Sequence, residues 1–208
     1  MLNNQLLLYL TYYFKDYLCS MLKEEINKAL EVLKSGGVIL YPTDTIWGLG
    51  CDATNQAGVD KLLKIKNRPA EKSLIVLLDV DNKIQSYINE VPEVAYDLIE
   101  YAENPLTIIF SGAKNLAANV INEDGSVGIR VVKHDFCTPL IQRFRKPIVS
   151  TSANISGAPS PKNFDDVSSE ITEAVDYIVD FEQENKSSKK PSTIMKLSPG
   201  GQFEFIRK

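Results

Sequence analysis

Short apolar runs recur along most of this chain, separated by segments of helical periodicity or by polar turns. Such runs are typical of strands that are buried on both faces of a sheet. In contrast, Ile26, Ala29, Leu30 and Leu33 repeat at helical spacing, and the glycines at 36–37 provide a helix stop. The chain is therefore expected to combine strands with helices.

The order of these segments indicates the fold class. Strand-like runs occupy residues 38–41, 74–78, 106–110, 127–132, 147–150, 175–179, 192–197 and 203–206. Further helices are expected after the N-cap residue Asn55 and over residues 81–88, 93–102 and 138–144, and an exposed loop over residues 183–190. Strict alternation of strand and helix fails in several places, so we expect an α/β (α+β) domain with one mixed sheet. A chain of 208 residues suits a single domain of this kind.

Residues 1–20 differ in character from the rest of the chain and contain the apolar run 6–14. This run is too short to span a bilayer, and no basic residue precedes it as in a secretory signal. Met21 opens a natural first helix, so one hypothesis is that translation starts there and that the start codon has been assigned too far upstream. The other is that residues 1–20 form an additional amphipathic helix. In both cases we expect them to lie outside the core domain of residues 21–208.

Charge and cysteine content narrow the class of protein. The formal net charge is −4, from 27 acidic and 23 basic residues, whereas a protein that coats nucleic acid needs an excess of cations. The three cysteines Cys19, Cys51 and Cys137 match neither a metal-ligand spacing nor a disulfide framework. A reducing, cytoplasmic location is therefore expected, with Cys51 and Cys137 as small buried apolar residues.

Several segments are more polar than their positions beside apolar runs require. Residues 41–50 (YPTDTIWGLG) offer two threonine hydroxyls, a carboxylate and glycines that permit close backbone approach. Residues 104–107 add a hydroxyl, and Arg130 interrupts the run 127–132. Residues 150–157 (STSANISG) supply hydroxyls, an amide and backbone N–H groups suited to an anion. Each segment alone also has a plain interpretation as a capped turn, a solvated strand face or a loop.

Three cations, Lys66, Arg68 and Lys72, follow a predicted helix. Cations at a helix C-terminus stabilise it by about 0.3–1 kcal/mol each. The other interpretation is a clamp for a polyphosphate, with Arg68 forming forked hydrogen bonds and the lysines acting as point charges. Spacing alone favours the first interpretation.

No other nucleotide-binding signature competes, because the sequence contains neither GxxxxGK[ST] nor GxGxxG after a strand. His134 is the single histidine. This argues against a histidine metal cluster and against a Ser-His hydrolase triad. His134 is expected to be a surface residue.

The chain closely resembles the YrdC/Sua5 family of threonylcarbamoyl-AMP synthases in the ordered set YPTDTIWGLG, KNRPAEKSL, NPLT, GIR, STSANISG, PSTI and the final Ile206-Arg207. The resemblance runs from about Met21 to the C-terminus. It implies a YrdC-like catalytic domain over residues 21–208, with a twisted mixed sheet, flanking helices and a large, positively lined cavity. It also implies that L-threonine, bicarbonate and ATP, with Mg2+, yield threonylcarbamoyl-AMP and pyrophosphate, and that a tRNA-modifying transferase complex receives the product.

The resemblance further implies which residues form the site. The implied catalytic pair is Lys66 and Arg68. The implied ATP contacts are Lys66, Arg68, Lys72, Thr107, Ser152, Asn154 and Arg207, and the implied threonine and bicarbonate contacts are Thr45, Arg130, Ser152 and Thr193, with Ser156 and Ser192 beside them. A carbamate formed from threonine and bicarbonate can itself attack the α-phosphate, so catalysis would rest on positioning and charge neutralisation.

Two alternatives remain open. The first is a YciO-like paralogue with the same fold, and the second is a non-catalytic module that binds double-stranded RNA or tRNA. The intact KxR and SxAN segments favour the synthase over the paralogue. The acidic balance of the chain weakens the RNA-binding alternative.

Overall fold

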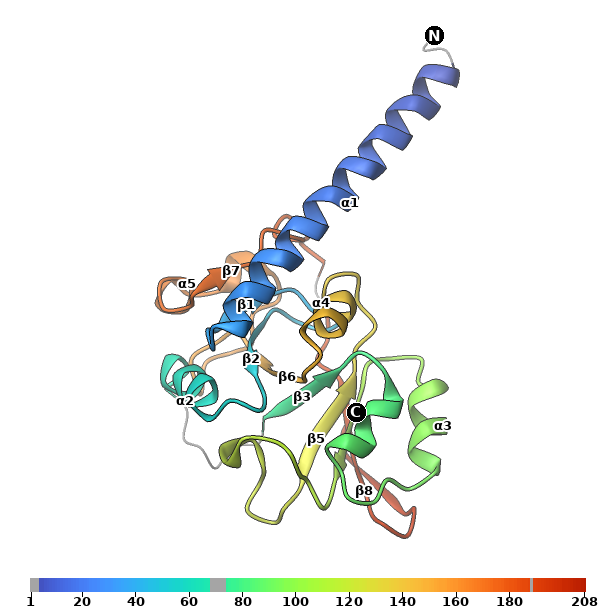
Figure 1. The fold of residues 1–208 in the computed structure, drawn as a ribbon, viewed down its shortest axis with the longest axis vertical. Coiled ribbons are helices and arrows are strands. Elements are labelled where there is room, and N and C mark those ends of the chain that lie inside the picture. Colours follow the sequence, from blue (N-terminus) through green and yellow to red (C-terminus); the bar gives the residue numbers. More distant parts are fainter. Residues whose placement is uncertain (1–3, 68–73, 188) are drawn as a thin grey trace.

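The computed structural model describes residues 4–67, 74–187 and 189–208 (Figure 1). Within them the chain forms a nine-stranded sheet in the order β7-β1-β2-β6-β3-β5-β4-β8-β9. The strands are β1 (Ile39–Tyr41), β2 (Gly48–Asp52), β3 (Ile75–Leu78), β4 (Leu106–Phe110), β5 (Val127–Val131), β6 (Ile148–Ser152), β7 (Tyr177–Ile178), β8 (Thr193–Leu197) and β9 (Phe203–Arg207). The pairs β1–β7, β3–β5 and β4–β8 are parallel and the other pairs are antiparallel. The predicted mixed sheet is confirmed.

The helices are α1 (Asn4–Lys34), α2 (Gln56–Ile65), α3 (Val94–Glu100), α4 (Cys137–Phe144) and α5 (Ser169–Thr172), with 3-10 turns at Asp81–Ser86, Ala118–Val120 and Phe164–Asp166. The predicted N-cap of α2 is confirmed, because the side chain of Asn55 accepts a hydrogen bond from the backbone N–H of Gly58. The segment predicted as a helix over 81–88 is a 3-10 helix over Asp81–Ser86.

Helix α1 contains 31 residues, so residues 4–20 continue directly into the predicted first helix instead of forming a separate one. The N-terminal part of α1 projects well beyond the sheet and the other helices (Figure 1). Leu18 and Met21 are exposed, whereas Ile26, Ala29 and Leu33 are buried. No helix among the described residues is long and apolar enough to cross a bilayer.

The side chains of the sheet divide between two hydrophobic clusters, because successive strand residues point to opposite faces. Helices α1 and α4 cover one face, where Leu33 and Leu140 pack with Tyr41. On the other face Leu40, the neighbour of Tyr41, joins Leu62 of α2. The predicted burial of Cys51 and Cys137 is confirmed, since each is at most 1% exposed. The hydrophobic core thus lies on both faces of the sheet.

Strand β2 was not predicted from the sequence. It lies between β1 and β6, and the two glycines Gly48 and Gly50 pair with Ser152 and Ser150. A Cβ atom on Gly50 would lie 2.7 Å from a ring carbon of Tyr41 and 3.0 Å from Cγ2 of Ile148. Glycine is weak in strands in general, but this strand requires it because the neighbouring side chains occupy the space.

Candidate active site

An open cavity of about 230 Å³ is lined by residues of β2 to β6, β8 and β9 and of the turn before β2. Alternate residues of single strands face it: Thr107 and Ile109 on β4, and Gly128 and Arg130 on β5. A Cβ atom on Gly128 would lie 3.3 Å from Cγ2 of Thr107, so glycine keeps this wall open. The polar lining consists of Thr45, Thr107, Asn122, Arg130, Ser150, Thr151, Ser152, Ser160, Ser192 and Arg207.

Among the described residues of this lining, Arg130 is one of two cations. Its side chain is 4% exposed, and its Nη2 lies 3.2 Å from Oδ1 of Asp44, whose side chain is 10% exposed. Burial raises the pKa of the Asp44 carboxyl, and the Arg130 guanidinium opposes that rise. The interpretation of Arg130 as a residue on a solvated strand face is therefore wrong: it is a buried cation paired with a carboxylate from the turn.

Arg207 supplies the second cation from the end of β9. Its Nε and Nη2 donate to the carbonyl oxygen of Ser192 at 3.1 and 2.8 Å, and the Ser192 and Thr107 hydroxyls lie 2.8 Å apart. Burial and the nearby positive charge of Arg130 both lower the pKa of Arg207. Two guanidinium groups on the walls of one cavity favour an anion between them.

Lys66 lies behind the loop that follows β6. It is 1% exposed, and its Nζ donates to the carbonyl oxygens of Ser152 and Asn154 at 2.5 and 2.6 Å. The backbone N–H of Ser156 donates in turn to the Lys66 carbonyl at 2.9 Å. Lys66 therefore holds the SxAN loop in the shape that presents Ser152 to the cavity.

The cavity brings together six of the residues implied by the resemblance: Thr45, Thr107, Arg130, Ser152, Ser192 and Arg207. Thr193 is next to Ser192 and Ile194, both of which line the cavity, so strand alternation turns Thr193 to the other face. The side-chain amide of Asn154 donates to the carbonyl oxygens of Ile155 and Ala158. Arg68 and Lys72 lie outside the described residues.

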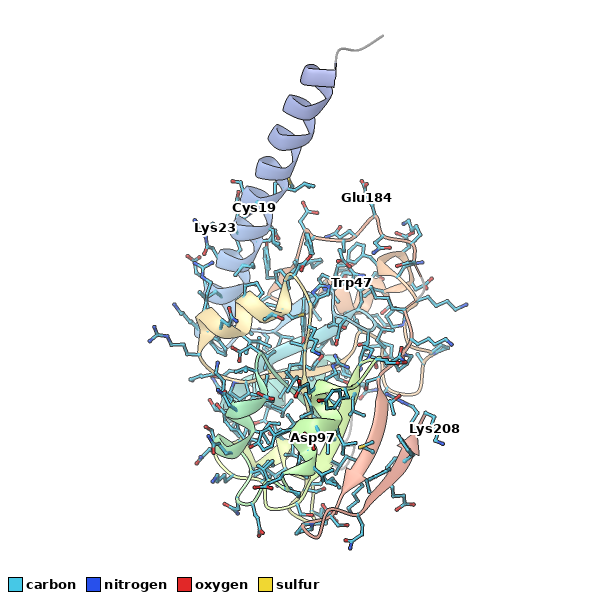
Figure 2. The ribbon with its side chains drawn as sticks, turned by 90° about the vertical axis from the view of Figure 1, so that its right-hand side faces the viewer. Cys19, Lys23, Trp47, Asp97, Glu184 and Lys208 are labelled. Carbon is cyan, nitrogen blue, oxygen red and sulfur yellow. The ribbon has the colours of Figure 1, made fainter. Side chains whose placement is uncertain are left out.

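Several residues that line the cavity were not predicted as site residues. Trp47 is 5% exposed and packs against Phe164, with ring centroids 4.8 Å apart. Figure 2 shows Trp47 within the body of the protein. Trp47 and Ser150 stand inside motifs that the sequence already singles out. Asn122 follows the 3-10 turn Ala118–Val120, and no motif marks it.

His134 is not the surface residue that was expected. Its side chain is 7% exposed, and its Nε2 lies 3.4 Å from Oε1 of Glu182. Burial lowers the pKa of His134, while Glu182 opposes that effect, and the backbone N–H of Phe136 donates to Nδ1 at 3.3 Å. His134 is thus a buried imidazole that organises the start of α4.

Across residues 4–67, 74–187 and 189–208, the structure contains no group of three or more His, Cys, Asp or Glu side chains that could hold a metal ion. The cavity instead combines arginines with hydroxyls and an amide. These groups suit the oxygen atoms of carboxylates and phosphates.

This combination of fold and site defines an α/β protein with a cavity for an anionic small molecule. The chain belongs to the Sua5/YciO/YrdC family, whose sequence model, described as "Telomere recombination", matches residues 31–208.

Known proteins that the chain resembles include two curated synthases. It is 36% identical over 181 residues to the threonylcarbamoyl-AMP synthase of Pseudoalteromonas translucida, covering 86% of this chain and 96% of the relative. It is 32% identical over 162 residues to that of Photobacterium profundum, covering 76% and 88%.

Solved structures agree with the fold. P. abyssi Sua5 complexed with L-threonine superimposes with a TM-score of 0.74 at 26% identity over 83% of this chain. The chain spans about half of that larger protein, 50% of its length. E. coli YciO superimposes with a TM-score of 0.76 at 23% identity over 88% of each chain, which supports the fold alone.

Proposed function

We propose that this protein is a threonylcarbamoyl-AMP synthase, an enzyme that converts L-threonine, bicarbonate and ATP into threonylcarbamoyl-AMP, pyrophosphate and water. One observation carries the proposal: Arg130 and Arg207 converge with the Thr45 and Ser152 hydroxyls on a single cavity. The similarity to curated synthases over 86% of the chain supports it, as does the likeness to a Sua5 solved with L-threonine.

The reaction requires no nucleophilic side chain from the protein. The threonine amine and bicarbonate give a carbamate and water. A carbamate oxygen then bonds to the α-phosphorus of ATP as the bond from that phosphorus to the bridging oxygen breaks, and pyrophosphate leaves. Bicarbonate, the carbamate, ATP and pyrophosphate are all anions, so the protein contributes fixed positive charge and alignment.

The proposed division of the site follows the geometry. Thr45 and Arg130 contact threonine and the carbamate, while Thr107 and Arg207 contact the nucleotide. Ser152 lies between the two groups. The guanidiniums neutralise carboxylate and phosphate charge, and the cavity walls shield the carbamate and the mixed anhydride from water.

Further parts of the proposal concern residues and partners beyond this cavity. Arg68 and Lys72 are proposed to hold the outer phosphates of ATP, which enters as its Mg2+ complex. Lys66 and Asn154 contribute through the loop that they shape, and Thr193, which faces away from the cavity, contributes to the threonine side through its neighbour Ser192. The product is a reactive mixed anhydride, so we propose a tRNA-modifying transferase as its acceptor.

The test is pyrophosphate release from ATP, with threonine and bicarbonate omitted in turn. We expect release only when all three substrates are present. Arg207→Ala should lower the rate by about 10²–10³-fold, the usual effect of removing one preorganised electrostatic contact. Arg143→Ala removes an exposed arginine of α4 and is the matched control. Release that is independent of threonine would contradict the proposal.

A further inference from the structure

The two threonines of the turn before β2 form a hydrogen-bonded pair. The hydroxyl oxygens of Thr43 and Thr45 lie 2.9 Å apart. Thr43 is 2% exposed and Thr45 is 3% exposed. Thr45 lines the cavity described above, whereas Thr43 does not, and both threonines line a separate small hollow.

The contacts of Thr43 fix the position of both hydroxyl protons. The Thr43 hydroxyl lies 2.8 Å from the carbonyl oxygen of Ile46, and a carbonyl can only accept, so Thr43 donates its single proton there. The Thr43 oxygen also accepts the backbone N–H of Thr45 at 3.0 Å. With its proton used, Thr43 can only accept from the Thr45 hydroxyl. Thr45 must therefore be the donor in this pair.

Consequently the Thr45 oxygen presents only lone pairs to the cavity. A lone pair repels a carboxylate or phosphate oxygen and attracts an N–H or O–H group. The anionic groups of a ligand are thus directed to Arg130 and Arg207 on the other walls. The cavity is polarised, with an acceptor at Thr45 and donors opposite.

We propose that Thr43 is a positioning residue that sets this polarity, and that Thr45 accepts a hydrogen bond from the amino group of the amino-acid substrate. The proposal rests on the proposed function. The amino nitrogen carries an N–H as an ammonium, as an amine and as a carbamate, so it is a donor throughout the reaction. A β-hydroxyl can donate or accept and has no comparable need for a partner that only accepts.

The test compares ligands that differ in one group, using calorimetric titration and the fluorescence of Trp47, the single tryptophan, which lines the cavity. The ligands are L-threonine, L-2-aminobutyrate without the hydroxyl, and 3-hydroxybutyrate without the amine. Thr43→Val frees the Thr45 hydroxyl to rotate. We expect it to weaken threonine and 2-aminobutyrate alike by about 3- to 10-fold, the range for one neutral hydrogen bond. Binding of 3-hydroxybutyrate should not change.

Two variants serve as controls. Thr43→Ser keeps the hydroxyl and should bind like the wild type. Thr138→Val removes a hydroxyl with the same pattern, which donates to the Val132 carbonyl and accepts from the His134 N–H, and it should also bind like the wild type. Thermal denaturation checks folding. If Thr43→Val does not fold, the comparison of Thr45→Val with Thr45→Ser tests the same acceptor.

The possible outcomes distinguish the positioning role of Thr43, the assignment of the amine contact to Thr45, and the proposed function. Unchanged threonine binding by Thr43→Val would overturn the positioning role. Weaker binding of threonine but not of 2-aminobutyrate would assign the contact to the β-hydroxyl and overturn the amine assignment. A wild-type protein that binds none of the three ligands would overturn the proposed function and this inference together.

Discussion

The buried pair of Asp44 and Arg130 allows a quantitative prediction about stability. Their side chains are 10% and 4% exposed, and the charged atoms lie 3.2 Å apart. Asp44→Asn leaves the Arg130 charge without its carboxylate in a site that water barely reaches. Breaking a buried ion pair by removing one partner typically costs about 3–5 kcal/mol.

The geometry places this pair at the lower end of that range. Neither Oδ1 of Asp44 nor Nε of Arg130 has a hydrogen-bond partner among the described residues, so the variant loses Coulombic attraction without losing a forked hydrogen bond. We expect a loss of about 3 kcal/mol. At about 2–4 °C per kcal/mol for a chain of this size, the melting temperature should fall by about 6–12 °C.

The assay is urea and thermal unfolding followed by circular dichroism, with Asp97→Asn as control. Asp97 is exposed on α3 (Figure 2), and its substitution should change stability by less than about 0.5 kcal/mol. The double variant Asp44→Asn/Arg130→Met removes both charges and should lose less than the sum of the single changes. A strictly additive double variant, or an Asp44→Asn protein as stable as the control, would refute the reasoning.

Three further predictions follow from packing and hydrogen bonding. Gly50→Ala places a methyl group 2.7 Å from a ring carbon of Tyr41. This substitution should destabilise the protein by about 1–3 kcal/mol. An unchanged midpoint of urea unfolding would contradict the prediction. Lys66→Met removes two charge-assisted hydrogen bonds to loop carbonyls. The free energy of unfolding should fall by about 1.5–3 kcal/mol or more, and hydrogen exchange in the SxAN loop should increase. Unaltered exchange there would count against the role of Lys66. Burial raises the pKa of Glu25, but hydrogen bonds from Tyr177, a backbone N–H and a lysine outweigh it and leave the pKa below its ordinary value. The stability that ionised Glu25 contributes is therefore present above the ordinary pKa and lost as the pH falls through the lowered pKa. Glu25→Gln should consequently be less stable than the wild type at neutral pH and approach it in acid. A pH-independent difference would argue against the linkage.

Much of the fold could be predicted from local pattern. The run 106–110 became β4 and the run 127–132 became β5 within one residue, because short, mainly apolar runs are typical of strands that are buried on both faces. Asn55 marked the start of α2 through an interaction within one turn of the chain. Strand β2 was not predicted because its Gly50 is required by the side chain of Tyr41 on a neighbouring strand, and a local sequence pattern does not show that contact.

The candidate site could likewise be predicted only in part, because several of its contacts join residues that are far apart in the sequence. Arg130 could be recognised as unusual within an apolar strand, but its partner Asp44 lies far away in sequence and depends on the sheet order. The face toward which Thr193 points depends on the register of β8, which apolar content alone left undetermined. Lys66 looked like a helix-end cation and in the structure supports a loop from another part of the chain.

The central claim is that one cavity receives an amino acid beside a nucleotide, and a crystal structure with L-threonine and a non-hydrolysable ATP analogue tests it most directly. We predict the threonine amine within hydrogen-bond distance of Thr45, its carboxylate toward Arg130, and the nucleotide beside Thr107 and Arg207. Density for either ligand only outside this cavity would contradict the account.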